Sequence, residues 1–113
     1  MEFLTSEDGT TARLVLTGRL DTAGAEALAF PLATLAAAKQ GLIIDMSGVS
    51  FMASIGLRHL ISAAKTLSRR NGRLVLLNPV TLVAEVLEAS GLTDLLPIVR
   101  SETEAKAAIS PTG

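Results

Sequence analysis

The sequence predicts a single α/β domain in which helices pack on a mostly parallel, mixed sheet of about five strands. The chain has 113 residues, which suits one domain with one core. Short apolar runs rich in β-branched residues alternate with longer stretches whose apolar residues recur at helical spacing. No linker, repeat or low-complexity tract interrupts this alternation, so we assign residues 1–113 to one domain.

The first predicted elements are a strand pair and an alanine-rich helix. Residues 12–17 are apolar and partly β-branched, which predicts a strand, and residues 3–6 are placed to pair with it across a short turn. Alanine and leucine dominate residues 21–39, which predicts a helix with Asp21 as its N-cap. Pro31 lies inside this stretch, so we expect the helix to kink or to divide into two pieces.

The middle of the chain predicts a strand, a helix and a second strand. Residues 42–46 form a continuous apolar run, typical of a strand that is covered on both faces, and Ser47-Gly48 is expected to end it. Residues 54–69 carry an apolar stripe at helical spacing and a basic outer face. Asn71-Gly72 indicates a turn before a strand at residues 73–77.

The last third predicts two short helices around an edge strand. Residues 80–89 are in helical register and stop at Ser90-Gly91, where glycine suits the left-handed C-terminal position. Residues 95–99 are expected at a sheet edge, because Pro97 cannot donate to a central ladder. The segment from Ser101 to Glu104 matches a capping box before a final helix. Right-handed crossovers then give a mostly parallel sheet in which the first strand is the exception.

The composition removes most enzyme classes. The chain has no cysteine, which excludes disulfides, thiolate metal sites and a cysteine nucleophile, and its single histidine, His59, excludes a two-histidine metal site within one chain. We therefore expect no cofactor, no metal and no catalytic residue. A formal charge of -1 gives no bulk attraction to nucleic acid or anionic lipid. The N-terminus lacks the features of a secretory signal, and no apolar run approaches the roughly 18 residues that cross a bilayer. We expect a cytoplasmic protein without membrane insertion.

The segment from residue 45 to residue 57 is the most informative part of the chain. Residues 49–52 are mainly apolar and are predicted to form a loop before a helix, whereas loops are usually polar. An apolar loop indicates either a segment packed inward or a surface kept for another protein. Asp45, at the expected strand end, is placed to fix this loop by accepting backbone N–H bonds.

Ser54 lies at or near the start of the long helix, and two interpretations of it remain open. Serine is a preferred N-cap, worth about 1 kcal/mol over alanine, and many serines at this position do only that. Alternatively the hydroxyl is a phosphate acceptor, because the free N–H groups and the helix dipole favour an added anion. A phosphoryl group adds about -1.5 to -2 charges, which would spoil an apolar docking face without unfolding the helix.

A serine hydrolase is a poor interpretation of the same segment. The sequence around Ser54 has the last glycine of a G-x-S-x-G elbow and lacks the first. His59 lies five positions later, which at about 100° per residue turns it some 140° around the helix from Ser54. We therefore expect His59 to be a solvated or partly packed helix residue.

Nearly the whole chain resembles a STAS domain, the module of bacterial anti-sigma factor antagonists. The resemblance rests on three segments: Thr17-Gly18-Arg19-Leu20-Asp21, residues 42–57, and Ala89-Ser90-Gly91-Leu92. It implies a STAS-like fold and a partner-switching role. Such a protein binds an anti-sigma factor that is also a serine kinase, releases it when phosphorylated, and is restored by a serine phosphatase.

The resemblance also implies roles for individual residues. The phosphate acceptor corresponds to Ser54, and Asp21 and Asp45 match acidic positions of the family. Many such antagonists carry aspartate where this chain has Ala53, and small or hydroxylated residues where it has Ile55. Together with the apolar segment and the adjacent basic helix face, this gives one set of expected partner-binding residues: Asp21, Val49, Phe51, Met52, Ala53, Ile55, Gly56 and Arg58.

A second function from another class stays open. The chain is also compatible with a STAS-like accessory subunit of a membrane transporter or a larger signalling assembly, in which Ser54 is only a helix cap. The two interpretations differ in whether Ser54 is phosphorylated by a serine kinase of the host.

Overall fold

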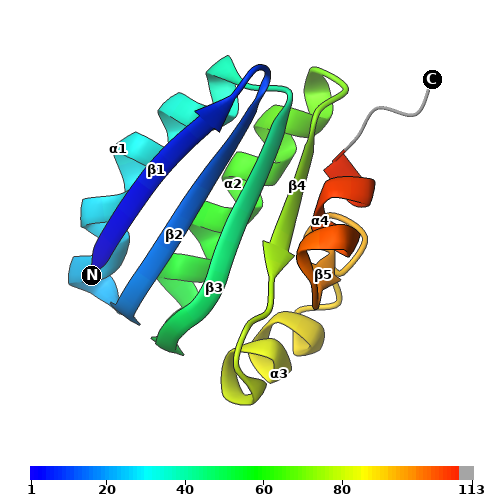
Figure 1. Ribbon diagram of the computed structural model, residues 1–113. Helices are drawn as coiled ribbons and strands as arrows, with labels where there is room; N and C mark the ends of the chain where they lie inside the picture. The colour runs from blue at the N-terminus through cyan, green and yellow to red at the C-terminus, as the bar shows by residue number, and fades with distance from the viewer. Residues whose placement is uncertain (110–113) are drawn as a thin grey trace.

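The computed structural model describes residues 1–109, which form a five-stranded sheet with helices on both faces (Figure 1). The strand order is β1-β2-β3-β4-β5; β1 is antiparallel to β2 and the other neighbours are parallel. The predicted fold class, with the first strand as the exception, is confirmed. In chain order the elements are β1 (Glu2–Asp8), β2 (Thr11–Leu20), α1 (Thr22–Ala38), β3 (Gly41–Met52), α2 (Ser54–Arg69), β4 (Arg73–Leu77), α3 (Thr81–Ala89), β5 (Ile98–Val99) and α4 (Glu102–Ile109).

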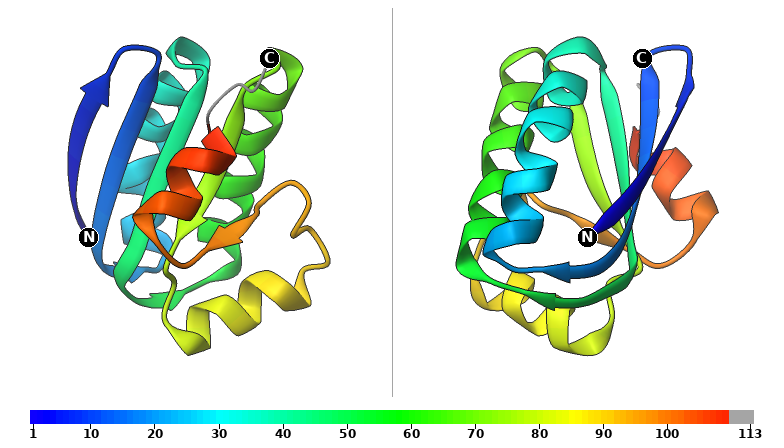
Figure 2. Two further views of the ribbon diagram at one scale, coloured as in Figure 1. Left: turned by 45° about the vertical axis from the view of Figure 1, so that its right-hand side comes forward. Right: turned by 90° about the vertical axis from the view of Figure 1, so that its left-hand side faces the viewer.

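The core lies mainly between the sheet and the pair α1 and α2, which cover one face side by side (Figure 2). Alternate residues of β2 point into this core, as period-2 burial requires. On the opposite face α4 covers a smaller apolar cluster on β3 and β4. The residues in that second cluster are Ile43, Val75, Leu77, Val99, Ala105 and Ile109. Within residues 1–109, no helix covers the part of this face formed by β1 and β2, and Leu4 of β1 is 74% exposed there (Figure 1).

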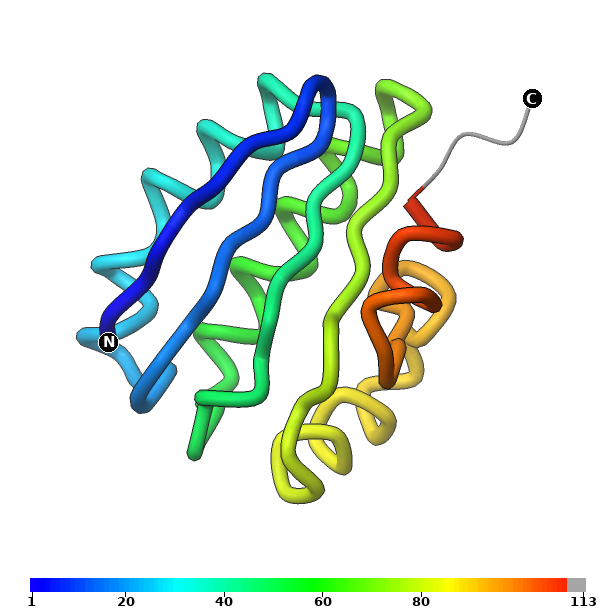
Figure 3. Tube along the Cα trace, in the orientation of Figure 1, coloured from blue at the N-terminus to red at the C-terminus, as the bar shows by residue number. Residues whose placement is uncertain are grey.

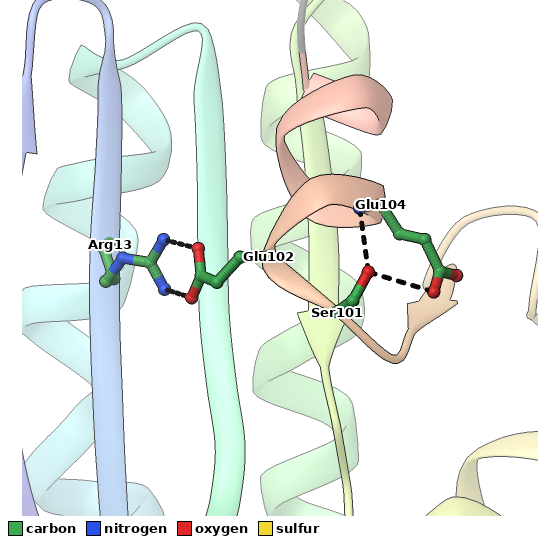
Figure 4. A network of polar contacts seen from close by, with 4 residues as sticks. All are labelled: Arg13, Ser101, Glu102 and Glu104. Carbon is green, nitrogen blue, oxygen red and sulfur yellow. Dashed lines mark hydrogen bonds and ion pairs between the residues drawn. The ribbon is translucent and has the colours of Figure 1, made fainter.

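Helix α4 is fixed at its N-terminus by two sets of polar contacts (Figure 4). Arg13 of β2 reaches across the sheet and donates to both carboxylate oxygens of Glu102, with Nη1 2.8 Å from Oε1. The Ser101 hydroxyl accepts from the Glu104 N–H at 3.2 Å and donates to the Glu104 carboxylate. The Ser101 half of the predicted capping box is therefore confirmed, whereas the Glu104 carboxylate accepts from the Ser101 hydroxyl and not from the Ser101 backbone N–H.

Helix α1 is continuous through Pro31, so of the two expected outcomes, a kink or a division into two pieces, the division does not occur. Leu28, on one side of the proline, and Leu32 and Leu35, on the other, are buried in the same core. Packing on a common core favours one helix despite the missing backbone donor. Asp21 is its N-cap, as predicted.

The expected end of the central strand at Ser47-Gly48 is also wrong, because β3 continues to Met52. The pairing of β3 with β2 shifts register twice beyond Asp45, and each shift gives β3 one extra residue. A Cβ on Gly48 would lie 2.7 Å from the Leu16 carbonyl oxygen, so glycine allows the two strands to approach. Ser47-Gly48 therefore marks a β-bulge rather than a strand end.

The remaining predicted elements are confirmed, with β1 and β2 longer than expected and β5 shorter. The turn at Asn71-Gly72 and β4 occur where expected, with Asn71 at φ 61°. Helix α3 ends before Gly91, which adopts φ 73°. Strand β5 is the edge strand, but it covers only two residues of the predicted 95–99, and the Pro97 carbonyl accepts from the Leu76 N–H. Within residues 1–109, no helix has both the length and the apolar character needed to traverse a bilayer.

Candidate functional site at the start of helix α2

The candidate site lies where β2 and β3 end and α1 and α2 begin. Leu20 and Met52 are paired at the ends of the two strands, and the Ala53 N–H donates to the Leu20 carbonyl at 2.9 Å. The chain then turns from β3 directly into α2, which the trace in Figure 3 shows at the lower end of the sheet. Parallel strands have their carboxyl ends at the same end of a sheet. Asp21, which follows β2, and Ser54, which follows β3, therefore lie at the same end of this sheet.

Close packing of α2 on β2 fixes the first turn of α2. Gly56 is buried, and a Cβ added to it would lie 2.6 Å from Cγ of Leu20. Leu20 itself is fully buried, so it has little room to move aside. The helix consequently begins as close to the sheet as its backbone allows, which sets the position of the Ser54 side chain.

Ser54 is the first residue of α2, and its side chain is exposed. The N-cap is Ala53, in extended conformation, and no side chain caps the helix. Ser54 thus lies near the N-cap as expected, but one position after it. The interpretation of Ser54 as a purely structural cap loses its basis, because the hydroxyl makes no capping hydrogen bond.

Two side chains on the neighbouring strand ends form an aromatic and cationic pair beside this turn. The Arg19 guanidinium lies 4.4 Å from the centre of the Phe51 ring, and the two residues are register partners in β2 and β3. A cation over an aromatic face is attracted by the ring quadrupole. Phe51 is half-buried, and the positive charge of Arg19 lies over its ring.

Arg19 is a site residue that the sequence reasoning missed. Its Nε also lies 3.8 Å from Oδ2 of Asp21, so it bridges Phe51 and the start of α1. The signal was present, because Arg19 lies in the Thr17–Asp21 segment that carries the family resemblance.

Asp21 has a clear structural task at this edge. Its Oδ1 accepts from the Gly24 N–H at 2.9 Å and so caps α1. This hydrogen bond is the largest cause that lowers the pKa of Asp21 below its ordinary value, and the Arg19 charge acts in the same direction. The carboxylate is therefore held in its charged form beside the Ser54 turn.

The apolar segment that was expected to form a loop belongs to β3, and only part of it reaches the surface. Val49 is fully buried and Met52 is 5% exposed, so both side chains pack into the core. Phe51, Ala53 and Ile55 are half-buried. Among the expected partner-binding residues, Asp21, Phe51, Ala53, Ile55 and Arg58 thus have exposed area, whereas Val49, Met52 and Gly56 are buried.

Asp45 accepts a backbone N–H as expected, but in a different place. Its Oδ1 accepts from the Ser47 N–H at 3.0 Å and from the Ser47 hydroxyl at 2.7 Å. These bonds stabilise the bulge of β3, not a loop before α2. Ile44 and Met46 point into the core under α1 and α2, so Asp45 faces the other side of the sheet and is not brought to Ser54.

Two further features bear on the chemistry of the chain, namely its possible metal ligands and its single histidine. Among residues 1–109, no three histidine, aspartate or glutamate side chains gather in a way that could hold a metal ion. His59 is half-buried and lines a shallow groove between α1 and α2 with Ala33 and Ser62. This agrees with its interpretation as a partly packed helix residue.

Comparison with known proteins decides the family. Residues 4–105 match the model of the STAS domain. The chain belongs to the STAS domain family. A relative from Bordetella bronchiseptica, BtrV, is 33% identical over 94 residues, which cover 82% of this chain and 81% of BtrV. BtrV carries the provisional description of an anti-sigma factor antagonist.

Two solved structures of one such antagonist, in its unphosphorylated and phosphorylated forms, are similar to this STAS domain. The unphosphorylated form of the anti-sigma factor antagonist SpoIIAA superposes with a TM-score of 0.80 at 26% identity, covering 94% of this chain and 95% of SpoIIAA. The phosphorylated form of SpoIIAA, described as a Bacillus cell fate determinant, gives a TM-score of 0.74 at 27% identity, covering 94% and 97%. The fold of this STAS domain is therefore similar to that of a protein solved with and without a phosphoryl group.

Proposed function

We propose that this STAS domain is an anti-sigma factor antagonist controlled by phosphorylation of Ser54. In this proposal the unphosphorylated protein sequesters an anti-sigma factor that is also a serine kinase, and phosphorylation of Ser54 releases it. A serine phosphatase returns the protein to its binding state. The observation that carries the proposal is the exposed Ser54 hydroxyl, free of any capping bond, in a chain whose relatives are named as antagonists.

The chemistry of the step is a phosphoryl transfer. The Ser54 oxygen attacks the terminal phosphorus of ATP, the bond to ADP breaks, and the hydroxyl proton passes to a base of the kinase. Both substrate and kinase must meet ATP, so the proposal places the protein in the cytoplasm. The chain itself contributes the acceptor and a surface, and catalysis belongs to its partner.

The position of Ser54 explains how a phosphoryl group could be added without unfolding α2. The first N–H groups of a helix have no intrahelical acceptor, and the dipole makes this end positive. An anion on the first residue is therefore compatible with the helix. Ala53 adds no carboxylate beside the acceptor, which removes one source of repulsion against the incoming phosphate.

The same added charge would change the surface around Ser54. Phe51 and Ile55 provide apolar area, and the Arg19 and Arg58 side chains provide the nearby positive charge. A group of about -1.5 to -2 charges in this setting must be desolvated whenever a partner covers the surface. Binding weakens for that reason, with no change of fold required.

Intact-mass measurement after incubation with ATP and the serine kinase of the host tests the acceptor. The wild-type chain is expected to gain one phosphoryl group, and Ser54→Ala is expected to gain none. Ser50→Ala is the matched control, because Ser50 is exposed on β3 four residues before Ser54. Equal labelling of Ser54→Ala and wild type, or no labelling by any such kinase, contradicts the proposal.

A further inference from the structure

Two exposed surfaces of the protein lie outside the site at Ser54, and they have complementary character. The first, which we call the helix-layer surface, is the outer side of α1 and α2 around Phe30, Lys65 and Arg69. Phe30 of α1 is 79% exposed, more than any other large apolar residue among residues 1–109. Its chain neighbour Ala29 lines, together with Ala33 and Ser62, the shallow groove between the two helices.

The positive charge of the helix-layer surface is not compensated within the described chain. Helix α2 contains no acidic residue, and α1 contains one, Glu26. Lys65 and Arg69 are exposed and lie four residues apart, on the same side of α2. The ion pairs within residues 1–109 are Arg13–Glu102, Arg19–Asp21 and Lys39–Glu7, and none of them includes a residue of α2.

The second surface, which we call the α3 surface, has the opposite charge and its own exposed apolar residues. Leu82 is 58% exposed and Val80, which precedes the helix, is 38% exposed. Glu85 and Glu88 are exposed on the same short helix, and α3 contains no basic residue. No ion pair within residues 1–109 includes either glutamate.

We propose that copies of this chain associate head to tail, with the α3 surface of one copy on the helix-layer surface of the next. Leu82 packs beside Phe30 at the groove, and Glu85 and Glu88 face Lys65 and Arg69. Apolar contact supplies the attraction, and the opposite charges fix the orientation.

Charge is the reason for preferring this arrangement to a two-fold dimer. A dimer through two helix-layer surfaces would set lysine and arginine against their own copies, and a dimer through two α3 surfaces would do the same with glutamate. Like charges placed opposite each other are unfavourable. The two surfaces also lie on different sides of the molecule, with α3 beyond the end of the sheet and α1 and α2 over its face (Figure 2). Such a heterologous contact builds rings or chains.

This association goes beyond the proposed phosphoswitch, because neither surface contains Ser54. Its failure would leave the proposed function untouched, since the labelling of Ser54 is measured separately. Conversely, the association is measured on the purified chain alone and needs no kinase.

The test is sedimentation velocity of the purified chain over a concentration series, at low and at high salt. Wild type is expected to show a mass that rises with concentration and an association that weakens in high salt, because the facing charges are screened. Phe30→Ser is expected to weaken the association about tenfold, as removal of a central aromatic contact does. Lys106→Glu, at an exposed position of α4, is the matched control and is expected to leave it unchanged.

Charge reversal provides the decisive comparison. In the double variant Lys65→Glu/Arg69→Glu, the helix-layer surface and the α3 surface are both acidic. In the double variant Glu85→Lys/Glu88→Lys, both surfaces are basic. Each double variant alone is expected to stay monomeric, and their equimolar mixture is expected to associate again. Circular dichroism of each variant shows that the fold is kept.

Three results would overturn the proposal. Wild type could remain monomeric at the highest concentration at which it stays dissolved. The two charge-reversed variants could fail to associate when mixed. Phe30→Ser could self-associate as strongly as wild type, which would place the contact between copies on another surface.

Discussion

At the scale of single residues, Ser54 is the position where an added negative charge is expected to favour folding and to oppose partner binding. The first turn of a helix favours an anion by about 0.3–1 kcal/mol. A partner that covers the turn must instead remove water from that anion. A negative charge at Ser54 is therefore expected to keep or raise the free energy of unfolding and to weaken partner binding. This combination distinguishes a switch from a structural site.

The variant Ser54→Asp tests this separation. We expect its free energy of unfolding in urea to equal or exceed that of wild type by up to about 1 kcal/mol. Its affinity for the anti-sigma partner, measured by titration calorimetry, is expected to fall, although one carboxylate is a weak copy of a phosphoryl group. Ser62→Asp in the middle of α2 is the control, because Ser62 is exposed but is not in the first turn. Unchanged affinity of Ser54→Asp would place the partner elsewhere.

Asp21 gives a second prediction, on the pH dependence of stability. The folded-state pKa of its carboxyl is lowered from 3.8, chiefly by the bond from the Gly24 N–H. A lowered folded pKa means that the contribution to stability is present above the unfolded value and is lost as the pH falls through the folded pKa. The stability advantage of wild type over Asp21→Asn is therefore expected to shrink below a pH of about 4, as urea denaturation at several pH values would show.

Asparagine is a suitable replacement for Asp21 because it remains a good N-cap and does not titrate. Glu26→Gln is the control for a carboxylate on the same helix, since Glu26 is exposed beyond the first turn. A constant difference between wild type and Asp21→Asn down to low pH would show that the charge of Asp21 does not contribute to folding.

At the scale of elements, the junction of β2, β3 and α2 decides where the site residues stand. Gly56 makes this junction possible, and its replacement offers a third prediction. In an ordinary helix, alanine is favoured over glycine by about 1 kcal/mol. Here a Cβ would lie 2.6 and 2.8 Å from two carbons of the fully buried Leu20. Gly56→Ala is therefore expected to destabilise the protein by about 1–3 kcal/mol.

Urea denaturation of Gly56→Ala measures this loss, and the labelling of Ser54 by its kinase should slow as the first turn of α2 moves. Ser62→Ala is the matched control, because it adds alanine to the same helix at an exposed position and should not destabilise it. A Gly56→Ala variant as stable as wild type would show that α2 can shift away from Leu20 at no cost.

The elements also show which features the sequence could predict. Hydrophobic periodicity and turn residues located each helix and strand, because these signals are local. The continuation of β3 through Ser47-Gly48 was not predicted, since it depends on the pairing of β3 with β2, which is distant in sequence. The same holds for Pro31, where tertiary packing outweighed a local helix breaker. At the site, Ser54 lies at the start of α2 as predicted, while the contact between Arg19 and Phe51 required the strand register.

At the scale of the whole molecule, the two faces of the sheet are held by different means. On the face of α1 and α2, a large continuous core binds the layers together. On the other face α4 contributes only two fully or nearly buried side chains, Ala105 and Ile109, and adds the ion pair of Glu102 with Arg13. This pair joins residues 89 positions apart, so it links the C-terminal helix to one of the first strands.

A double-mutant cycle on Arg13 and Glu102 tests how much this link contributes. The Arg13 side chain is 25% exposed and that of Glu102 54%, so water screens the pair and a coupling of about 1 kcal/mol or less is expected. Its two parallel bonds favour the upper part of that range, since bidentate pairs have fixed geometry. Unfolding of wild type, Arg13→Ala, Glu102→Ala and the double variant gives the coupling, which should decrease in high salt. If the coupling is zero at low salt while amide exchange in α4 is equally slow in all four proteins, Ala105 and Ile109 alone hold the helix.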